Sequence, residues 1–210
     1  MPRAIAAFAA ALLSAFSLAA SAAPAAAAAA PAPATAVGDM VMGAPSAKVT
    51  VIEYASVVCS HCAAFNAEVF PAFKAKYIDT GKVRYVMREF PTQPVELAAA
   101  GFLVARCAPA DKYFAVVDTL FRGQTKLFES RDAKAYLTDA GKAGGLTEEQ
   151  VQACLQDKAK LDAFNARVQT AMETAKIQAT PTFIIGDKRL EGGQSLAQLD
   201  AVLSPLLAAR

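Results

Sequence analysis

The chain has 210 residues, with 21 basic and 19 acidic side chains and a formal net charge of +2 at pH 7. This near balance argues against nucleic acid or another polyanion as a partner. Beyond the N-terminal region, no stretch is long and apolar enough to predict a membrane span.

The N-terminal part predicts export followed by a linker. Residues 1–22 have the layout of a secretory signal peptide: Arg3 precedes an apolar run, and the run ends in small residues at 20–22. A membrane anchor is the alternative, because the run is only just long enough to span a bilayer. Residues 23–37 are rich in Ala and Pro and uncharged, which predicts a linker rather than a short alanine helix. We therefore expect one exported domain over residues 38–210.

The first half of this domain alternates between strand and helix patterns. Residues 48–56 are rich in β-branched side chains and predict a buried strand. Residues 63–79 have helical spacing, with Pro71 expected to kink the helix. Residues 82–90 alternate between apolar and polar side chains, which predicts a second strand.

The second half opens with a long helical block. From about residue 95 to 178 every segment has helical spacing, and Thr147 with Gln150 forms a candidate capping box. The chain then returns to a strand at Thr182–Ile185 and a partner strand at Arg189–Glu191.

A final helix is expected at residues 196–208, where Ser195 and Gln198 form a second candidate capping box. The element order is strand, helix, strand, helical block, hairpin and helix, with a C-x-x-C motif between the first strand and the first helix. This combination predicts an α/β, thioredoxin-like fold with an inserted helical block at about residues 95–178.

The motif itself is Cys59-Ser60-His61-Cys62 and contains the only histidine of the chain. A cysteine at a helix start faces unpaired backbone N–H groups and the positive end of the helix dipole, and both stabilise a thiolate. We therefore expect Cys59 to be the nucleophile and Cys62, one turn further, to be the resolving thiol. His61 would add a cation or hydrogen-bond donor beside Cys59.

Three other interpretations of the motif are weaker. A zinc site usually needs four ligands in two close pairs, and the remaining cysteines, Cys107 and Cys154, are isolated from each other in the sequence. A purely structural disulfide between Cys59 and Cys62 would close too small a ring to gain much loop entropy. In hydrolases, a Cys and His pair normally meets through the fold rather than two residues apart.

The segment "ATPTFII" supports redox chemistry. A proline between a threonine and a strand is expected where Thr180–Pro181 is a cis bond that turns the backbone toward the cysteines. The backbone of Thr180 could then pair with a bound peptide strand. An ordinary turn leading into a strand is the alternative.

Together, "VIEYASVVCSHCAAFN" and "TPTFIIG" resemble the DsbA-like thiol:disulfide oxidoreductases of the thioredoxin superfamily, in particular the alphaproteobacterial type. The resemblance implies that Cys59 is the nucleophile, Cys62 its partner and Pro181 a cis-proline. It also implies a proton-transfer role for Glu53, for which a solvent-facing strand residue is the alternative. The chain departs from the family with a serine between the cysteines and with Asn66 where a second acid can occur.

Cys107 and Cys154 lie in separate segments of the helical block. An exported chain with an even number of cysteines favours disulfides. We expect these two residues to form one structural disulfide between two helices, with two unpaired buried thiols as the alternative.

The sequence therefore predicts a periplasmic enzyme that introduces disulfides into reduced exported proteins and is reoxidised by a DsbB-like membrane partner. No cofactor or metal is expected. A disulfide isomerase or reductase of the ScsC or DsbC type is one alternative, and a copper-binding protein using Cys59, His61 and Cys62 is another. Residues 23–37 carry no heptad pattern that could join protomers, so we expect a monomer.

Overall fold

The computed structural model describes Met1 and residues 38–209. The predicted signal peptide and linker, apart from Met1, lie outside the described residues. Within the described part of the chain, no helix combines the length and the apolar character needed to cross a bilayer.

A five-stranded mixed sheet forms the centre of the domain, in the order β1-β3-β2-β4-β5. Strand β2 runs parallel to β3, whereas the β1–β3, β2–β4 and β4–β5 pairs are antiparallel. The strands span Met40–Met42 (β1), Val49–Ala55 (β2), Val83–Glu89 (β3), Thr182–Ile185 (β4) and Lys188–Glu191 (β5).

Strand β2 is the middle strand, and all seven of its residues are buried. Its side chains alternate between two apolar layers, as the period of two in a strand requires. Val51 and Ala55 belong to the main core, and Ile52 and Tyr54 belong to a smaller core on the other face. The expected buried strand at residues 48–56 is therefore present with slightly shorter bounds.

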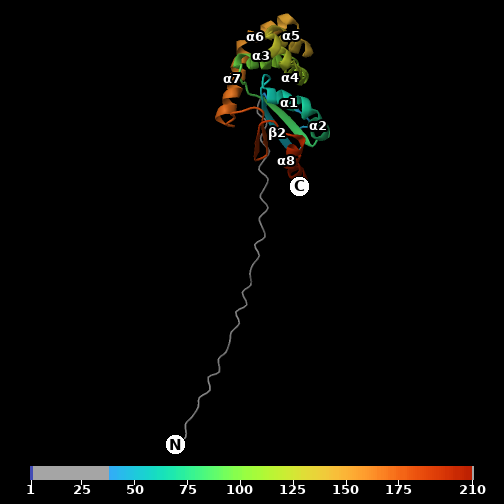
Figure 1. The fold of residues 1–210 in the computed structure, drawn as a ribbon, viewed down its shortest axis with the longest axis vertical. Helices are drawn as coiled ribbons and strands as arrows, with labels where there is room; N and C mark the ends of the chain where they lie inside the picture. The colour runs from blue at the N-terminus through green and yellow to red at the C-terminus, as the bar shows by residue number, and fades with distance from the viewer. Residues whose placement is uncertain (2–37, 210) are drawn as a thin grey trace.

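Helices cover both faces of the sheet (Figure 1). Helix α1 (Ser60–Glu68), helix α2 (Phe70–Phe73) and a π-helical turn (Lys74–Ile78) follow β2, with Pro71 at the start of α2. The helical pattern is thus interrupted just before Pro71, because proline suits the first turn of a helix and not its interior.

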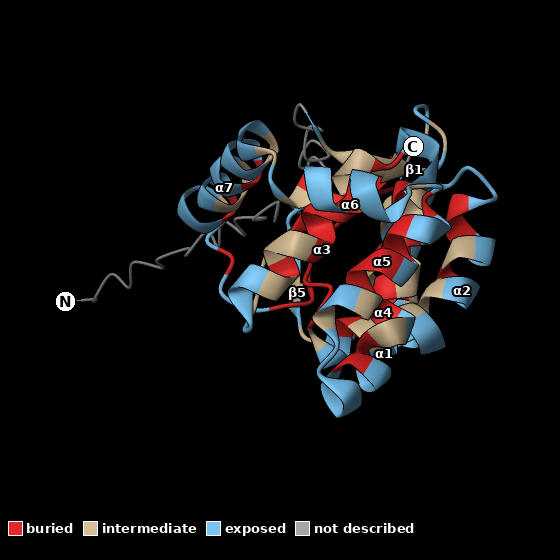
Figure 2. Cartoon of the chain, turned by 90° about the horizontal axis from the view of Figure 1, so that it is seen from above, coloured by how far each residue is buried: buried red, intermediate tan, exposed pale blue. Residues whose placement is uncertain are grey.

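The helical block lies between β3 and β4 in the chain and sits beyond one end of the sheet (Figure 1). Its helices turn buried residues toward one another and exposed residues outward (Figure 2), as amphipathic helices do. Thr147 and Gln150 form the predicted capping box. The helices are α3 (Val95–Cys107), α4 (Tyr113–Ser130), α5 (Ala133–Ala143), α6 (Glu148–Leu155) and α7 (Lys158–Glu173), with a short 3₁₀ turn at Ala110–Lys112.

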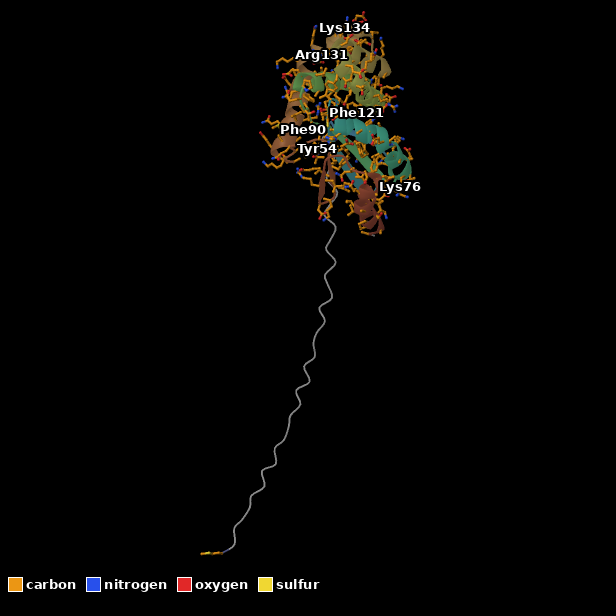
Figure 3. The ribbon with its side chains drawn as sticks, viewed as in Figure 1. Tyr54, Lys76, Phe90, Phe121, Arg131 and Lys134 are labelled. Carbon is orange, nitrogen blue, oxygen red and sulfur yellow. A yellow bond between two sulfur atoms is a disulfide. The ribbon has the colours of Figure 1, made fainter. Side chains whose placement is uncertain are left out.

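The side-chain view shows how far this block extends from the sheet. Tyr54 and Phe90 lie near its junction with the sheet, Phe121 lies close to helix α1, and Arg131 and Lys134 lie toward the far end (Figure 3). Only α7 returns along the sheet, where its Ala171 joins the smaller core.

The C-terminal hairpin and helix match the sequence expectation closely. The predicted final helix is α8 (Leu196–Ala208), and Ser195 and Gln198 cap it reciprocally. Strand β1 was not predicted, because its three residues lie between the glycines Gly38 and Gly43 and give no alternation long enough to recognise. The α/β, thioredoxin-like fold with an inserted helical block is confirmed.

Candidate active site

The two cysteines of the motif lie at the start of helix α1. Cys59 is the N-cap residue with extended backbone angles, and its carbonyl accepts the first helical hydrogen bond from the N–H of Ala63 at 3.0 Å. Both Cys59 and Cys62 are free thiols in the structure. Cys59 is partly exposed, whereas Cys62 is fully buried. An attacking thiol can therefore reach Cys59 but not Cys62.

The segment before β4 lies directly against Cys59. The peptide bond between Thr180 and Pro181 is cis, and the Cys59 thiol donates a hydrogen bond to the Thr180 carbonyl at 3.4 Å. Thr180 and Pro181 are both buried. The fold thus brings together residues that are about 120 positions apart in the chain, as the sequence motif "TPTFII" suggested.

The surroundings of the two thiols shift their pKa values in opposite directions. The Cys62 thiol, the Thr180 side chain and the backbone N–H groups of Cys62 and His61 together lower the pKa of Cys59 from 9.0 to about 5, although partial burial opposes them. Burial is the main reason why the pKa of Cys62 is raised well above its usual value. At neutral pH the reduced protein should therefore hold a Cys59 thiolate beside a Cys62 thiol.

This asymmetry predicts the pH dependence of alkylation by iodoacetamide. Because only the thiolate reacts, Cys59 should react at a constant rate above about pH 6 and tenfold more slowly for each pH unit below its pKa. A free cysteine should lose reactivity already below about pH 8.5. Peptide mapping of the alkylated protein checks which thiol reacts first. Faster labelling of Cys62, or a midpoint near that of free cysteine, would contradict this assignment.

Glu53 is buried in the main core on β2, so the alternative of a solvent-facing strand residue is wrong. The hydroxyl of Tyr85 on β3 donates a hydrogen bond to its carboxylate at 2.6 Å. Burial is the main reason why the pKa of Glu53 is raised to about 8; the charge of Cys59 adds to this increase, and the Tyr85 hydrogen bond opposes it. Its electrostatic effect reaches Cys62, whose pKa it raises. Glu53 is therefore a buried acid coupled to both cysteines.

His61 lies on the exposed side of helix α1. Its backbone N–H acts on the Cys59 thiolate. At residue 61, the stabilisation of the thiolate that is expected at a helix N-terminus therefore comes from the main chain.

Two side chains from the helical block hold the loop that leads into Cys59. The amide of Gln124 on α4 donates to the carbonyls of Val57 and Cys59, at 2.8 and 3.1 Å, and the hydroxyl of Tyr136 on α5 donates to Val57 at 3.0 Å. Gln124 is itself buried. Sequence analysis missed both residues, because a polar side chain on a helical pattern gives no signal of which distant loop it contacts.

The remaining two cysteines form a disulfide. Cys107 at the end of α3 and Cys154 in α6 are joined, with their Cα atoms 6.3 Å apart. The bridge closes a loop of 47 residues within the helical block. It lies in a different part of the fold from the thiols at the start of α1.

The sheet, the C-x-x-C motif at a helix start and the proline segment against it define a thioredoxin-like protein. A family model described as thioredoxin matches residues 35–204, so the chain belongs to this thioredoxin family. Its resemblance to DsbA-like proteins is confirmed by a solved structure of a variant of alpha-DsbA1 from Wolbachia pipientis. That structure is 27% identical, covers 82% of this chain and 92% of its own, and superposes with a TM-score of 0.75.

Two curated relatives have names that describe disulfide chemistry. A Rickettsia bellii protein named "Putative protein-disulfide oxidoreductase" is 34% identical over 73% of this chain and 59% of its own length. "Disulfide bond formation protein D" of Bacillus subtilis is 27% identical over 72% of this chain and 69% of its own. The chain thus spans about three-fifths of the Rickettsia relative.

A further solved structure supports the fold alone. It is described as a protein-disulfide isomerase from Novosphingobium aromaticivorans and is 21% identical, with a TM-score of 0.71 over 81% of this chain and 98% of its own.

Proposed function

We propose that the protein is a periplasmic thiol:disulfide oxidoreductase that transfers the disulfide between Cys59 and Cys62 to reduced exported proteins. The observation that carries the proposal is the asymmetry of the two thiols: Cys59 is accessible with a pKa of about 5, and Cys62 is buried. Stabilising the Cys59 thiolate favours the reduced pair, which makes the corresponding disulfide a stronger oxidant.

In the proposed reaction a substrate thiolate attacks the Cys59 sulfur, and the bond between Cys59 and Cys62 breaks. Cys62 leaves with the electron pair and takes a proton from Glu53, whose high pKa supplies one at neutral pH. A second substrate thiolate then attacks the substrate sulfur of the mixed disulfide. Cys59 leaves as a stable thiolate, the substrate is oxidised, and the enzyme pair is reduced.

The segment at Thr180 and Pro181 is the proposed contact for the substrate backbone. The Thr180 carbonyl already accepts a hydrogen bond from the Cys59 thiol. A peptide joined to Cys59 would therefore run past backbone groups of this segment, which suits pairing with an extended chain of varied sequence. No cofactor is required, since a DsbB-like membrane oxidase would restore the disulfide. The signal peptide at residues 1–22, the linker at 23–37 and a monomeric state belong to the same proposal.

Trapping thiols in the intact cells that produce the protein tests the direction of this activity. Acid quenching followed by alkylation should find Cys59 and Cys62 mostly oxidised, as an oxidase requires. A mostly reduced pair would instead support an isomerase or reductase of the ScsC or DsbC type.

Light scattering adds an independent test, since enforced shuffling by an isomerase of this fold generally relies on joined protomers. A monomer agrees with the oxidase, and a stable oligomer would contradict it. Metal analysis of the reduced protein tests the copper-binding alternative. That alternative predicts a fixed amount of copper per protein chain, held by Cys59, His61 and Cys62.

A further inference from the structure

The buried pair of Tyr85 and Glu53 is a feature that the resemblance to known proteins did not suggest. Tyr85 is 1% exposed and Glu53 is 2% exposed. The two side chains come from neighbouring parallel strands and are not directly opposite each other, because Tyr85 is paired with Val51. The 2.6 Å hydrogen bond between them is therefore a specific diagonal contact across the sheet.

Tyr85 also borders a cavity of about 340 Å³ between α2 and α4. Its ring packs against Phe70 and Phe114, with ring centroids 5.0 and 6.1 Å apart. These contacts fix the ring and with it the direction of the hydroxyl. The Tyr85 ring is thus held by its aromatic neighbours, and its hydroxyl is held against the buried carboxylate of Glu53.

Several titratable and charged groups surround the pair. Glu53 interacts with Cys59 and Cys62, and Tyr85 interacts with Cys62 and with Tyr113 of α4. On the cavity side, the charged residues that line the wall with Tyr85 are Lys74, Asp118 and Arg122. Of these groups, Tyr85 is the one that forms a hydrogen bond with Glu53 in the described part of the chain.

We propose that Tyr85 is a positioning residue for the resolving step, in which its hydroxyl holds the Glu53 carboxylate as the base that takes the proton of Cys62. This inference rests on the proposed function, because it assigns the thiol chemistry to Cys59 and Cys62. Tyr85 itself touches neither sulfur in this role and acts through Glu53.

The step is the formation of the enzyme disulfide from a mixed disulfide on Cys59. The Cys62 proton passes to the Glu53 carboxylate, and the Cys62 sulfur attacks the Cys59 sulfur. The bond between Cys59 and the outer sulfur breaks, and the outer group leaves as a thiolate with the electron pair. The two cysteines are oxidised, and the outer group is reduced.

The timing of this step follows from the same contacts. In the reduced protein the Cys59 thiolate raises the pKa of Glu53. Forming the mixed disulfide removes that charge and lowers the pKa of Glu53, so a larger fraction of Glu53 is ionised and able to accept the Cys62 proton when that proton must leave. The Tyr85 hydroxyl donates to the carboxylate and so favours its ionised form throughout.

An aromatic disulfide reagent that releases a coloured thiolate separates the two thiols in a stopped-flow experiment. Mixed with the reduced protein, it should release one thiolate when Cys59 attacks and a second when Cys62 resolves the mixed disulfide. The first phase tests the proposed function. The second phase, followed as a function of pH, tests the role of Tyr85.

In Tyr85→Phe, the first phase should keep its rate, and the pH midpoint of the second phase should rise by about one to two units, since a hydrogen bond to a charged group is lost. At neutral pH this corresponds to a second phase about 10- to 100-fold slower. In Glu53→Gln, the rate of the second phase should no longer depend on the ionisation of residue 53. It should increase only at the higher pH at which the Cys62 thiol itself ionises.

Tyr113→Phe is the matched control. Tyr113 on α4 is also a buried tyrosine, and its hydroxyl donates a hydrogen bond at 3.2 Å to the buried Glu89, which lies on β3 like Tyr85. Its removal should leave the midpoint of the second phase unchanged, and circular dichroism should show all three variants folded. An equal shift in Tyr113→Phe, or an unchanged second phase in Tyr85→Phe or Glu53→Gln, would overturn the inference. Absence of the first phase in the unmodified protein would instead overturn the proposed function.

Discussion

Replacing Cys59 by serine is expected to reduce thiol–disulfide exchange to the uncatalysed background, whereas Cys62→Ser should trap the protein in mixed disulfides. Cys59 is the accessible sulfur of the pair, so its loss removes the point of attack. Without Cys62, the Cys59 thiolate can still attack an external disulfide, but the variant has no second thiol to displace the partner from the resulting mixed disulfide. Oxidation of a reduced dithiol peptide in a buffer containing glutathione disulfide measures exchange in Cys59→Ser and in the unmodified protein. For Cys62→Ser, the reduced variant is mixed with a disulfide-bonded peptide, and non-reducing electrophoresis detects the mixed disulfide.

The double variant Cys107→Ser with Cys154→Ser is the matched control for cysteine loss. This disulfide lies in the helical block, so the exchange rate should stay close to that of the unmodified protein at temperatures where the variant is folded. Opening its 47-residue loop should nevertheless cost about 4 kcal/mol of stability on a chain-entropy estimate. Exchange that survives in Cys59→Ser, or disappears only in the control, would contradict the proposed roles.

The placement of the main groups of this site could be predicted because they lie in short motifs. Cys59 and Cys62 are three positions apart on one helix start, and the Thr180–Pro181 bond belongs to a recognisable segment. The local physics of a helix N-terminus then indicates which cysteine is activated. The central strand and the final helix were predicted for a similar reason, since their apolar period and caps are local signals.

The groups that support the site could not be predicted in the same way. The contact between Tyr85 and Glu53 depends on the register of two strands, and that of Gln124 with the Cys59 carbonyl depends on how the helical block docks. The strand pattern left Glu53 open to either face, because a single residue step in register reverses the face. Such contacts arise from tertiary packing, which a single sequence does not encode in a local pattern.

The largest stability effect of a single charge is expected at Glu89, a further residue that the sequence did not single out. Its side chain is fully buried at the end of β3 and forms ion pairs with Arg106 of α3 and Arg167 of α7. It also accepts a hydrogen bond from Tyr113 at the start of α4. One carboxylate therefore joins the sheet to three helices of the inserted block. It borders a cavity of about 210 Å³ that both arginines also line.

Glu89→Ala should lower the free energy of unfolding by about 3–5 kcal/mol, because two partly buried guanidinium groups lose their counter-ion while a buried hydroxyl loses its acceptor. Urea unfolding measures the change. Asp162→Ala is the control, since Asp162 pairs with Lys158 on the exposed face of α7 and should matter by less than about 1 kcal/mol.

A double-mutant cycle with Arg167→Ala isolates the coupling to Glu89. If the carboxylate and the guanidinium stabilise each other, the loss in the double variant should be smaller than the sum of the two single losses. Additive losses, or a Glu89→Ala effect as small as that of Asp162→Ala, would mean that this buried cluster does not hold the helical block on the sheet. The block carries Gln124, which hydrogen-bonds the Cys59 carbonyl. A loosened block should therefore also slow exchange at Cys59, even though Glu89 lies outside the cysteine site.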